Sequence, residues 1–205
     1  MRNREKTGPQ KGINFNLGER HSIVLMSRSP NAQYHDEFQD NNTVLIYEGH
    51  NVPKRKGIDP KSVDQPERDP KGTLTQNGKF HEAAQQFKIG DRTAERVKVY
   101  EKIQSDTWIY HGFFLLTDSW IKNDGIRNVF KFKLNATDET QFTVKESNEI
   151  QQRKVIPSRI MRKILEQYGC KCHKCGGEKN LVFIHTGTNS MTRENVKIIC
   201  ENHDV

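Results

Sequence analysis

Two short motifs toward the C-terminal end constrain the fold of this chain more than any other feature. In Cys172-His-Lys-Cys175 and in Cys200-Glu-Asn-His203, two residues separate a pair of potential metal ligands. This spacing lets one tight turn present two ligands to a tetrahedral ion, and two such turns complete a closed structural site. We therefore expect Cys172, Cys175, Cys200 and His203 to bind a structural Zn²⁺.

The position of the cysteines in the chain also favours a metal site. All four cysteines follow Gly169, and a cytosolic chain does not need disulfides there. Cys170 is then a spare thiol and His173 a weaker candidate ligand; the alternative is that the cysteines are unrelated buried residues. A module this small buries too little apolar surface to be stable alone, so metal binding would supply much of its folding free energy.

The charge of the chain suggests an anionic partner. Its formal net charge is +7, and residues 151–205 contain ten Lys and Arg against five Asp and Glu. Such a basic module favours a polyanion, because each neutralised phosphate releases counterions; the alternative is a solvated surface with a high pI. No apolar stretch approaches the roughly 18 residues of a membrane span, and the start lacks a signal-peptide core. We expect a cytoplasmic protein with no membrane partner.

Residues 12–147 show mostly the patterns of strands. Short apolar or alternating runs, separated by turn residues, occur at 21–26, 44–47, 96–100, 108–116 and 129–134. In the last run Phe130, Phe132 and Leu134 are expected to face the core while Lys131 and Lys133 face water. Many short strands of this kind favour a barrel or a rolled sheet.

Two intervals depart from the strand pattern. A helical stripe runs from Phe80 to Phe87 after Asn77 and Gly78, and residues 51–72 have no periodicity and predict a large loop. Its basic residues Lys54, Arg55 and Lys56 are candidate phosphate contacts. With the C-terminal module, these patterns predict an α+β protein.

A second helix is expected at the start of the C-terminal module. Ser158 is a candidate N-cap and Gly169 a candidate terminator, with one apolar face between them, made by Ile160, Ile164, Leu165 and Tyr168. We therefore predict two domains, residues 12–147 and residues 156–205, the second apparently short at its C-terminus.

Three stretches of this module resemble the HNH (ββα-metal) nucleases: residues 156–176, 180–185 and 192–204. The resemblance implies that His185 is the general base that activates water and that Asn195 fixes the loop holding it. It further implies that Asp204 helps to bind a catalytic Mg²⁺ or Mn²⁺. A base opposite a metal that neutralises the leaving phosphate oxygen is a minimal hydrolytic site.

One position favours an alternative to catalysis. Ile184 stands where the HNH family usually has a carboxylate that binds the catalytic metal. The alternative is a non-catalytic protein that binds modified DNA, in which a degenerate HNH module adds only affinity.

The N-terminal domain resembles the SRA (SET and RING associated) domains, which bind modified cytosine in DNA. The resemblance rests on the order and spacing of residues 31–37, 45–50, 74–78, 95–100, 110–116 and 129–134, together with Trp120. It implies an SRA/PUA-like β-barrel with short helices.

An SRA-like domain holds a base that has swung out of the duplex. Two aromatic faces can sandwich that base, at about 1–3 kcal/mol per stacked base, and a carboxylate can accept from the cytosine amino group. Tyr34 and Tyr47 are the candidate faces, and either Asp36 or Glu37 the acceptor. The alternative is that these are ordinary strand tyrosines and a solvated acidic turn.

Together the two resemblances imply a modification-dependent endonuclease. Such an enzyme would recognise 5-methylcytosine or 5-hydroxymethylcytosine in double-stranded DNA by base flipping and hydrolyse phosphodiesters at the HNH site. Because one site per chain would have to cut two strands, we expect a homodimer. The same resemblance implies a location in the bacterial cytoplasm.

Overall fold

The computed structural model describes residues 12–18, 21–28, 32–40, 43–104, 107–137, 156–178, 181–186, 192–200 and 203. The chain divides into two compact units, residues 1–153 (unit 1) and residues 154–205 (unit 2). The predicted domain limits, 12–147 and 156–205, stay a prediction because residues 138–155 lie outside the described part. None of the described helices is long and apolar enough to cross a membrane.

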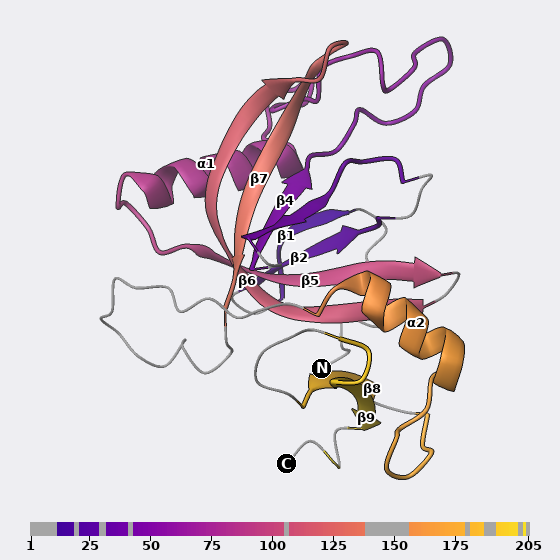
Figure 1. The fold of residues 1–205 in the computed structure, drawn as a ribbon. Helices are drawn as coiled ribbons and strands as arrows, with labels where there is room; N and C mark the ends of the chain where they lie inside the picture. The colour runs from indigo at the N-terminus through magenta and orange to yellow at the C-terminus, as the bar shows by residue number, and fades with distance from the viewer. Residues whose placement is uncertain are drawn as a thin grey trace. The chain divides into compact units, whose positions relative to one another are not determined.

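In its described residues, unit 1 consists of one sheet and one helix (Figure 1). The seven strands are β1 (Ile13–Gly18), β2 (His21–Met26), β3 (Glu37–Gln39), β4 (Val44–Glu48), β5 (Glu95–Gln104), β6 (Thr107–Asn123) and β7 (Asn128–Ala136). The helix α1 (Gln76–Lys88) lies between β4 and β5 in the sequence. The predicted mainly-β character with few helices is confirmed.

The sheet is rolled but open. Its strand order is β1-β2-β5-β6-β7-β4-β3, with β2 and β5 parallel and the other neighbours antiparallel. Within the described residues the edge strands β1 and β3 do not pair with each other, so the expected closed barrel is wrong.

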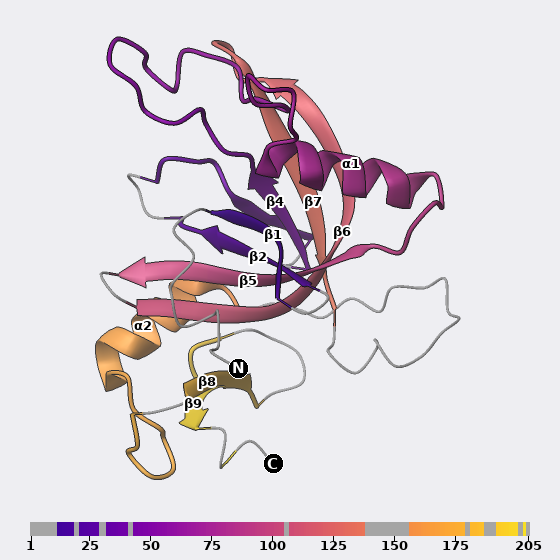
Figure 2. The same cartoon turned by 180° about the vertical axis from the view of Figure 1, so that it is seen from behind.

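The open sheet has a physical cause in its strand lengths. The long strand β6 pairs with β5 through its first half and with β7 through its second, and a register shift between Leu116 and Asp118 bends it between the two. The edge strand β3 has only three residues, too few to reach across, and α1 packs against β1, β6 and β7 (Figure 2).

The helix α1 covers the core with the predicted apolar stripe. Phe80, Ala83 and Ala84 are buried, and the Phe80 ring meets the Phe132 ring edge-on at 5.5 Å. The helix starts earlier than expected: Thr75 is the N-cap and its side chain accepts from the Gly78 N–H. Asn77 and Gly78 therefore belong to the first turn of α1 and do not precede it.

Strand β7 shows the predicted alternation in part, since Lys131 and Lys133 are less buried than their apolar neighbours but not fully exposed. Phe130, Phe132 and Leu134 are buried, as expected for the core face. Lys131 was expected to face water, but its ammonium lies 2.8 Å from the carboxylate of the buried Glu48, and its side chain is only 12% exposed. A buried carboxylate needs such a partner, so this lysine is drawn inward.

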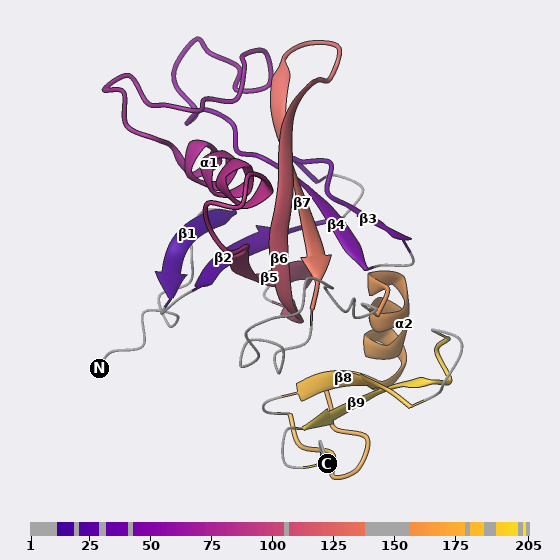
Figure 3. The same ribbon diagram turned by 90° about the vertical axis from the view of Figure 1, so that its left-hand side faces the viewer.

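Unit 2 consists of a helix and a two-stranded hairpin (Figure 3). The elements are α2 (Ser158–Tyr168), β8 (Leu181–His185) and β9 (Val196–Cys200), and the two strands are antiparallel. Ile160 and Ile164 of α2 pack against Val196 and Ile198 of β9.

The ends of α2 differ slightly from the prediction. Gly169 is the C-cap residue as expected, with φ 67°. The N-cap position is Pro157, which makes no side-chain capping bond, so the expected cap residue is instead the first residue of the helix. The apolar face is therefore the main contribution of α2 to the stability of unit 2.

Candidate functional site

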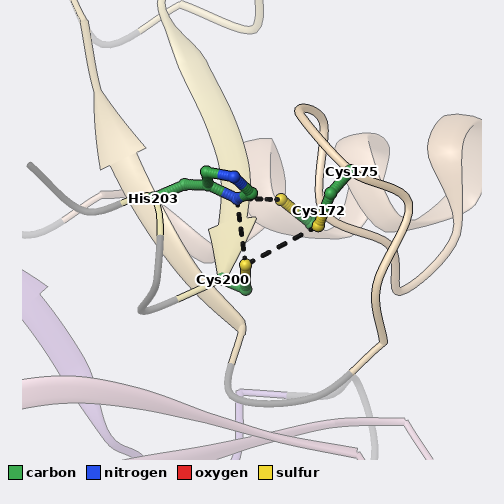
Figure 4. Close-up of side chains that lie close together, drawn as sticks. All are labelled: Cys172, Cys175, Cys200 and His203. Carbon is green, nitrogen blue, oxygen red and sulfur yellow. Dashed lines mark hydrogen bonds between the residues drawn. The ribbon is translucent and has the colours of Figure 1, made fainter.

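The four predicted zinc ligands meet at one point of unit 2 (Figure 4). The Sγ atoms of Cys172, Cys175 and Cys200 and a ring nitrogen of His203 all lie within 4.8 Å of one another. The His203 Nδ1 is 3.6 Å from the Cys172 Sγ and 3.1 Å from the Cys200 Sγ, and the Sγ atoms of Cys175 and Cys200 are 3.8 Å apart. The four residues thus form a cluster that can hold a metal ion.

The geometry and donor set of this cluster fit zinc. With Zn–S distances of about 2.3 Å and Zn–N distances of about 2.0 Å, ligand atoms at tetrahedral positions lie roughly 3.4–3.8 Å apart, close to the separations here. Three sulfur atoms and one imidazole nitrogen are the ligands of closed structural zinc sites. Cys170 is exposed and, like His173, stands outside the cluster.

The first metal-binding turn is held by backbone hydrogen bonds. The Cys172 N–H donates to the Gly177 carbonyl, and the Gly176 N–H donates to the Cys172 carbonyl, both at 2.8 Å. Burial raises the pKa of the Cys172 thiol, but N–H groups of Cys175, Cys200 and Lys174 outweigh burial and lower the pKa to about 5. The turn therefore favours the thiolate form that binds metals.

The predicted catalytic residues lie at the other end of the hairpin. His185 pairs with Val196 while Leu181 pairs with Cys200, and four residues of strand correspond to about 13 Å. Asn195 is next to His185, since the Asn195 carbonyl accepts from the Thr186 N–H at 2.7 Å. The structure thus brings His185 and Asn195 together, away from the cysteines. Asp204 lies outside the described residues.

Ile184 has a structural role on the metal side of the hairpin. Its side chain packs against the cluster of Cys172, Ile199 and Cys200. It supplies apolar contact to the metal-binding turn at the position where the HNH resemblance would lead one to expect a carboxylate.

Unit 1 contains a cleft of about 1300 Å³. Its walls come from the end of β2, from the segments before β3 and after β4, from the start of α1, and from the facing ends of β5 and β6. Among the described residues, Tyr34 and Asp36 line this cleft, and Tyr47 and Glu37 do not.

Of the two candidate carboxylates, Asp36 is the one at the cleft. Its Oδ1 accepts from the Glu48 N–H at 3.0 Å. Burial is the largest influence on this carboxyl group and raises its pKa to about 7, with the nearby Glu48 charge acting in the same direction. Glu37 is exposed on β3, where it accepts from the Gln39 side chain at 2.9 Å.

The two candidate tyrosines lie in different environments. Tyr47 is 1% exposed, and its hydroxyl donates to the Leu25 carbonyl at 3.2 Å. The ring beside Tyr34 in the cleft is instead that of His50, with centroids 6.0 Å apart and planes 33° apart. Sequence reasoning did not single out His50, although it ends the stretch 45–50 that resembles the SRA family.

The backbone of His50 is fixed by Asn77 on α1. The His50 N–H donates to the Asn77 Oδ1 at 2.7 Å, and the Asn77 Nδ2 donates back to the His50 carbonyl at 2.8 Å. A Cβ atom at Gly49 would lie 2.6 Å from the Gln65 Oε1 and 2.8 Å from the Asn77 Oδ1, so only glycine fits there. These contacts join the end of stretch 45–50 to the start of α1.

Glu48 and Arg127 join two walls of the cleft. The carboxylate of Glu48 accepts from the His35 N–H at 3.3 Å and lies 3.8 Å from the Arg127 guanidinium. Arg127 also donates to the carbonyls of Pro60 and Val63. Both charged side chains are about 95% buried. The pair therefore links the segment carrying Tyr34 and Asp36 to the long loop after β4.

Comparisons with known proteins give matches among solved structures. Neither a protein-family model nor a curated protein matches the sequence. The chain is similar to the SRA domain of SUVH5 in complex with hemimethylated CG DNA, at 23% identity over 62% of this chain and 72% of that one, with a TM-score of 0.40.

Two further structures are similar at the same level. The SRA domain of SUVH5 bound to fully hydroxymethylated CG DNA is 22% identical over 70% of this chain and 79% of that one, with a TM-score of 0.41. The modification-dependent restriction endonuclease TagI is 16% identical over 98% of this chain and 73% of that one, with a TM-score of 0.42. At these identities and scores, function has to be inferred from the residues of this chain.

Proposed function

We propose that this chain is a modification-dependent DNA endonuclease that recognises 5-methylcytosine or 5-hydroxymethylcytosine flipped out of double-stranded DNA. The observation that carries the proposal is the cleft of unit 1, which is lined by the neighbouring rings of Tyr34 and His50 and also by Asp36. The structural neighbours include an SRA domain in complex with modified DNA and a modification-dependent restriction endonuclease, and the proposal combines these two activities.

The chemistry of these three side chains suits a flipped cytosine. Tyr34 offers an aromatic face for stacking. Two stacking contacts of about 3.5 Å each require rings about 7 Å apart, so the Tyr34 and His50 rings would part by about 1 Å from their 6.0 Å separation. The Asp36 carboxyl group can accept from the cytosine amino group, and in its protonated form it can also donate to the ring nitrogen beside it.

The proposed second activity is hydrolysis in unit 2. The order α2, metal-binding turn, β8, β9, second metal-binding turn is the order expected from the resemblance to HNH nucleases. His185 is the proposed general base and Asn195 the residue that holds its loop, with Asp204 proposed to help bind a catalytic Mg²⁺ or Mn²⁺. A structural Zn²⁺ at the cysteine end would stiffen the hairpin that presents His185.

One observation favours a second candidate function. Ile184 packs against the metal-binding turn, and it gives the proposed catalytic metal no carboxylate at that position. On this alternative, unit 2 is a zinc-stabilised module that adds DNA affinity to a reader and does not cut. An Ile184→Asp change would put a carboxylate against Cys172, Ile199 and Cys200, so it should destabilise unit 2.

A cleavage assay on matched duplexes separates the two candidates. The duplexes are identical except for unmodified cytosine, 5-methylcytosine or 5-hydroxymethylcytosine, and each is incubated with Mg²⁺ or Mn²⁺. We expect cleavage of modified duplexes only, abolished by His185→Ala without loss of zinc or of binding. Binding of modified duplexes without cleavage in either metal would support the reader function and rule out the nuclease function. Cleavage that ignores modification would remove the reader.

Two properties of the proposed enzyme follow from its expected partner. Because one hydrolytic site per chain has to cut both strands, a homodimer is proposed on DNA. A location in the bacterial cytoplasm is also proposed, because a restriction enzyme meets foreign DNA there. Sedimentation of the protein with and without modified duplex would test the first property.

A further inference from the structure

An exposed tryptophan lies at the rim of the cleft in unit 1. Trp108 of β6 is 44% exposed, and it lines the same cleft as Tyr34 and Asp36. Its register partner on β5 is Lys102, which is also exposed and also lines the cleft. The sheet therefore presents a large aromatic ring and an ammonium group opposite each other across two strands.

A second pair of residues, Tyr100 and Tyr110, lies next to Trp108 and Lys102 along the same two strands. Tyr100 and Tyr110 are opposite each other in the register, and their rings lie 5.0 Å apart with planes 31° apart. Because side chains alternate along a strand, Tyr110 shares a face of β6 with Trp108, and Tyr100 shares a face of β5 with Lys102. Trp108 thus continues an aromatic surface held in place by strand pairing.

The cleft is larger than one base requires. Its volume of about 1300 Å³ exceeds the range of roughly 300–1000 Å³ that encloses a drug-sized ligand. Two further cations, Arg55 and Arg68, line it together with Lys102. Stacking rings among cations are the means by which proteins bind unpaired nucleotides without reading their sequence.

We propose that Trp108 and Lys102 form a second nucleotide subsite, in which the indole ring stacks on a base next to the one held by Tyr34 and Asp36, and the ammonium meets its phosphate. This subsite rests on the proposed function for its setting. It adds affinity that is independent of modification, whereas Tyr34 and Asp36 supply the preference for modified cytosine.

Tryptophan fluorescence gives a direct readout of the subsite. The chain has two tryptophans, and Trp120 is outside the described residues that line the cleft. In the Trp120→Phe protein all indole emission therefore comes from Trp108. Titration with a modified duplex, and separately with a six-nucleotide single strand, should quench that emission at the same concentrations at which anisotropy of a labelled DNA reports binding.

Binding measurements on three variants complete the test. Trp108→Ala should weaken binding of both the duplex and the single strand about 5- to 160-fold, the range for loss of one base-stacking contact, while Trp108→Tyr should restore most of the affinity. Lys102→Gln should lower the slope of log affinity against log salt by about one. The ratio of affinities for modified and unmodified duplex should stay unchanged in all three.

The outcomes separate the subsite from the proposed function. Unquenched Trp108 emission at saturating DNA, together with wild-type affinity of Trp108→Ala, would overturn the subsite even if the protein prefers modified DNA. Equal affinity of the intact protein for modified and unmodified duplexes would remove the proposed reader. Quenching of Trp108 emission by the single strand, together with weaker single-strand binding by Trp108→Ala, would still support the subsite in that case.

Discussion

The two units of this chain are stabilised in different ways. Unit 1 buries large side chains between α1 and one continuous sheet, among them Phe80 of α1 and Phe114 and Phe132 of the sheet. Unit 2 has two small apolar clusters beside four side chains that could hold a metal ion. Because a module of this size cannot hold itself together by burial alone, unit 2 should depend on its metal while unit 1 should not. The proposed reader and the proposed hydrolytic module can thus be perturbed separately.

Removal of the metal should have the largest effect and should stay within unit 2. Cys200→Ala leaves three ligands, and structural zinc binding is worth about 10–16 kcal/mol in comparable modules. We expect loss of zinc and loss of protection from amide hydrogen exchange in α2, β8 and β9. The amide protection of β2, β5 and β7 should stay unchanged. The matched control is Cys170→Ala, because Cys170 is exposed and outside the cluster. A metal-free protein with an intact hairpin would refute the comparison.

Asp36 should give unit 1 a pH dependence opposite in sign to that of unit 2, where the lowered pKa of the Cys172 thiol makes stability rise with pH. Burial raises the pKa of Asp36 from 3.8 to about 7, so between these pH values the folded state holds a proton that the unfolded state has lost. Unit 1 should therefore lose stability as pH rises from about 4 to 7, on the order of 4 kcal/mol in all, and change little above that through this group.

Urea denaturation of the intact protein across this pH range measures the effect on unit 1. The isosteric change Asp36→Asn should flatten the profile, because an amide carries no proton that titrates. A wild-type profile identical to that of Asp36→Asn would show that the carboxyl group ionises normally.

Loss of the link between the cleft walls should have a smaller effect. Arg127→Met removes the more distant of two cations beside Glu48, the nearer being Lys131, and also the donors to the Pro60 and Val63 carbonyls. The lost hydrogen bonds should cost unit 1 about 3 kcal/mol. Proteolysis within residues 51–74 should become faster. Arg68→Met is the control, because Arg68 is exposed and bonds only locally to the Gly72 carbonyl among the contacts described. Equal protease resistance of both variants would contradict the link.

The smallest expected effect falls on binding and not on folding. Tyr34→Ala should reduce the preference for modified cytosine by about 1–3 kcal/mol, the value of one stacked base, and leave zinc content unchanged. Tyr47→Ala should instead destabilise unit 1, because Tyr47 is buried and hydrogen-bonded to Leu25. The reverse pattern would assign the stacking face to Tyr47.

The sequence predicted the parts of this molecule that depend on local geometry. The four metal ligands come in pairs two residues apart, so one turn fixes each pair. Strands such as β2 and β7 show their apolar pattern directly, and the stripe from Phe80 to Ala84 identifies α1.

Other parts could not be predicted because they join residues that are distant in the chain. Nothing local links Glu48 to Arg127 or His50 to Asn77, and these contacts set the cleft. The environment of Tyr47 was hidden for another reason: all five residues of β4 are buried, so alternation does not reveal which side faces the cleft. Whether the sheet closes depends on the length of the edge strand β3. The length of that strand cannot be predicted from short apolar runs in the sequence.

The measurement that tests the central claim most directly is equilibrium binding of the intact protein to matched duplexes that carry cytosine, 5-methylcytosine or 5-hydroxymethylcytosine, at several salt concentrations. Phosphate contacts weaken with salt and ignore base identity, whereas stacking on Tyr34 and hydrogen bonding to Asp36 depend on the base. We predict a preference for modified duplexes that persists as salt lowers all three affinities. Equal affinities at every salt concentration would contradict the account of unit 1 as a modified-cytosine reader.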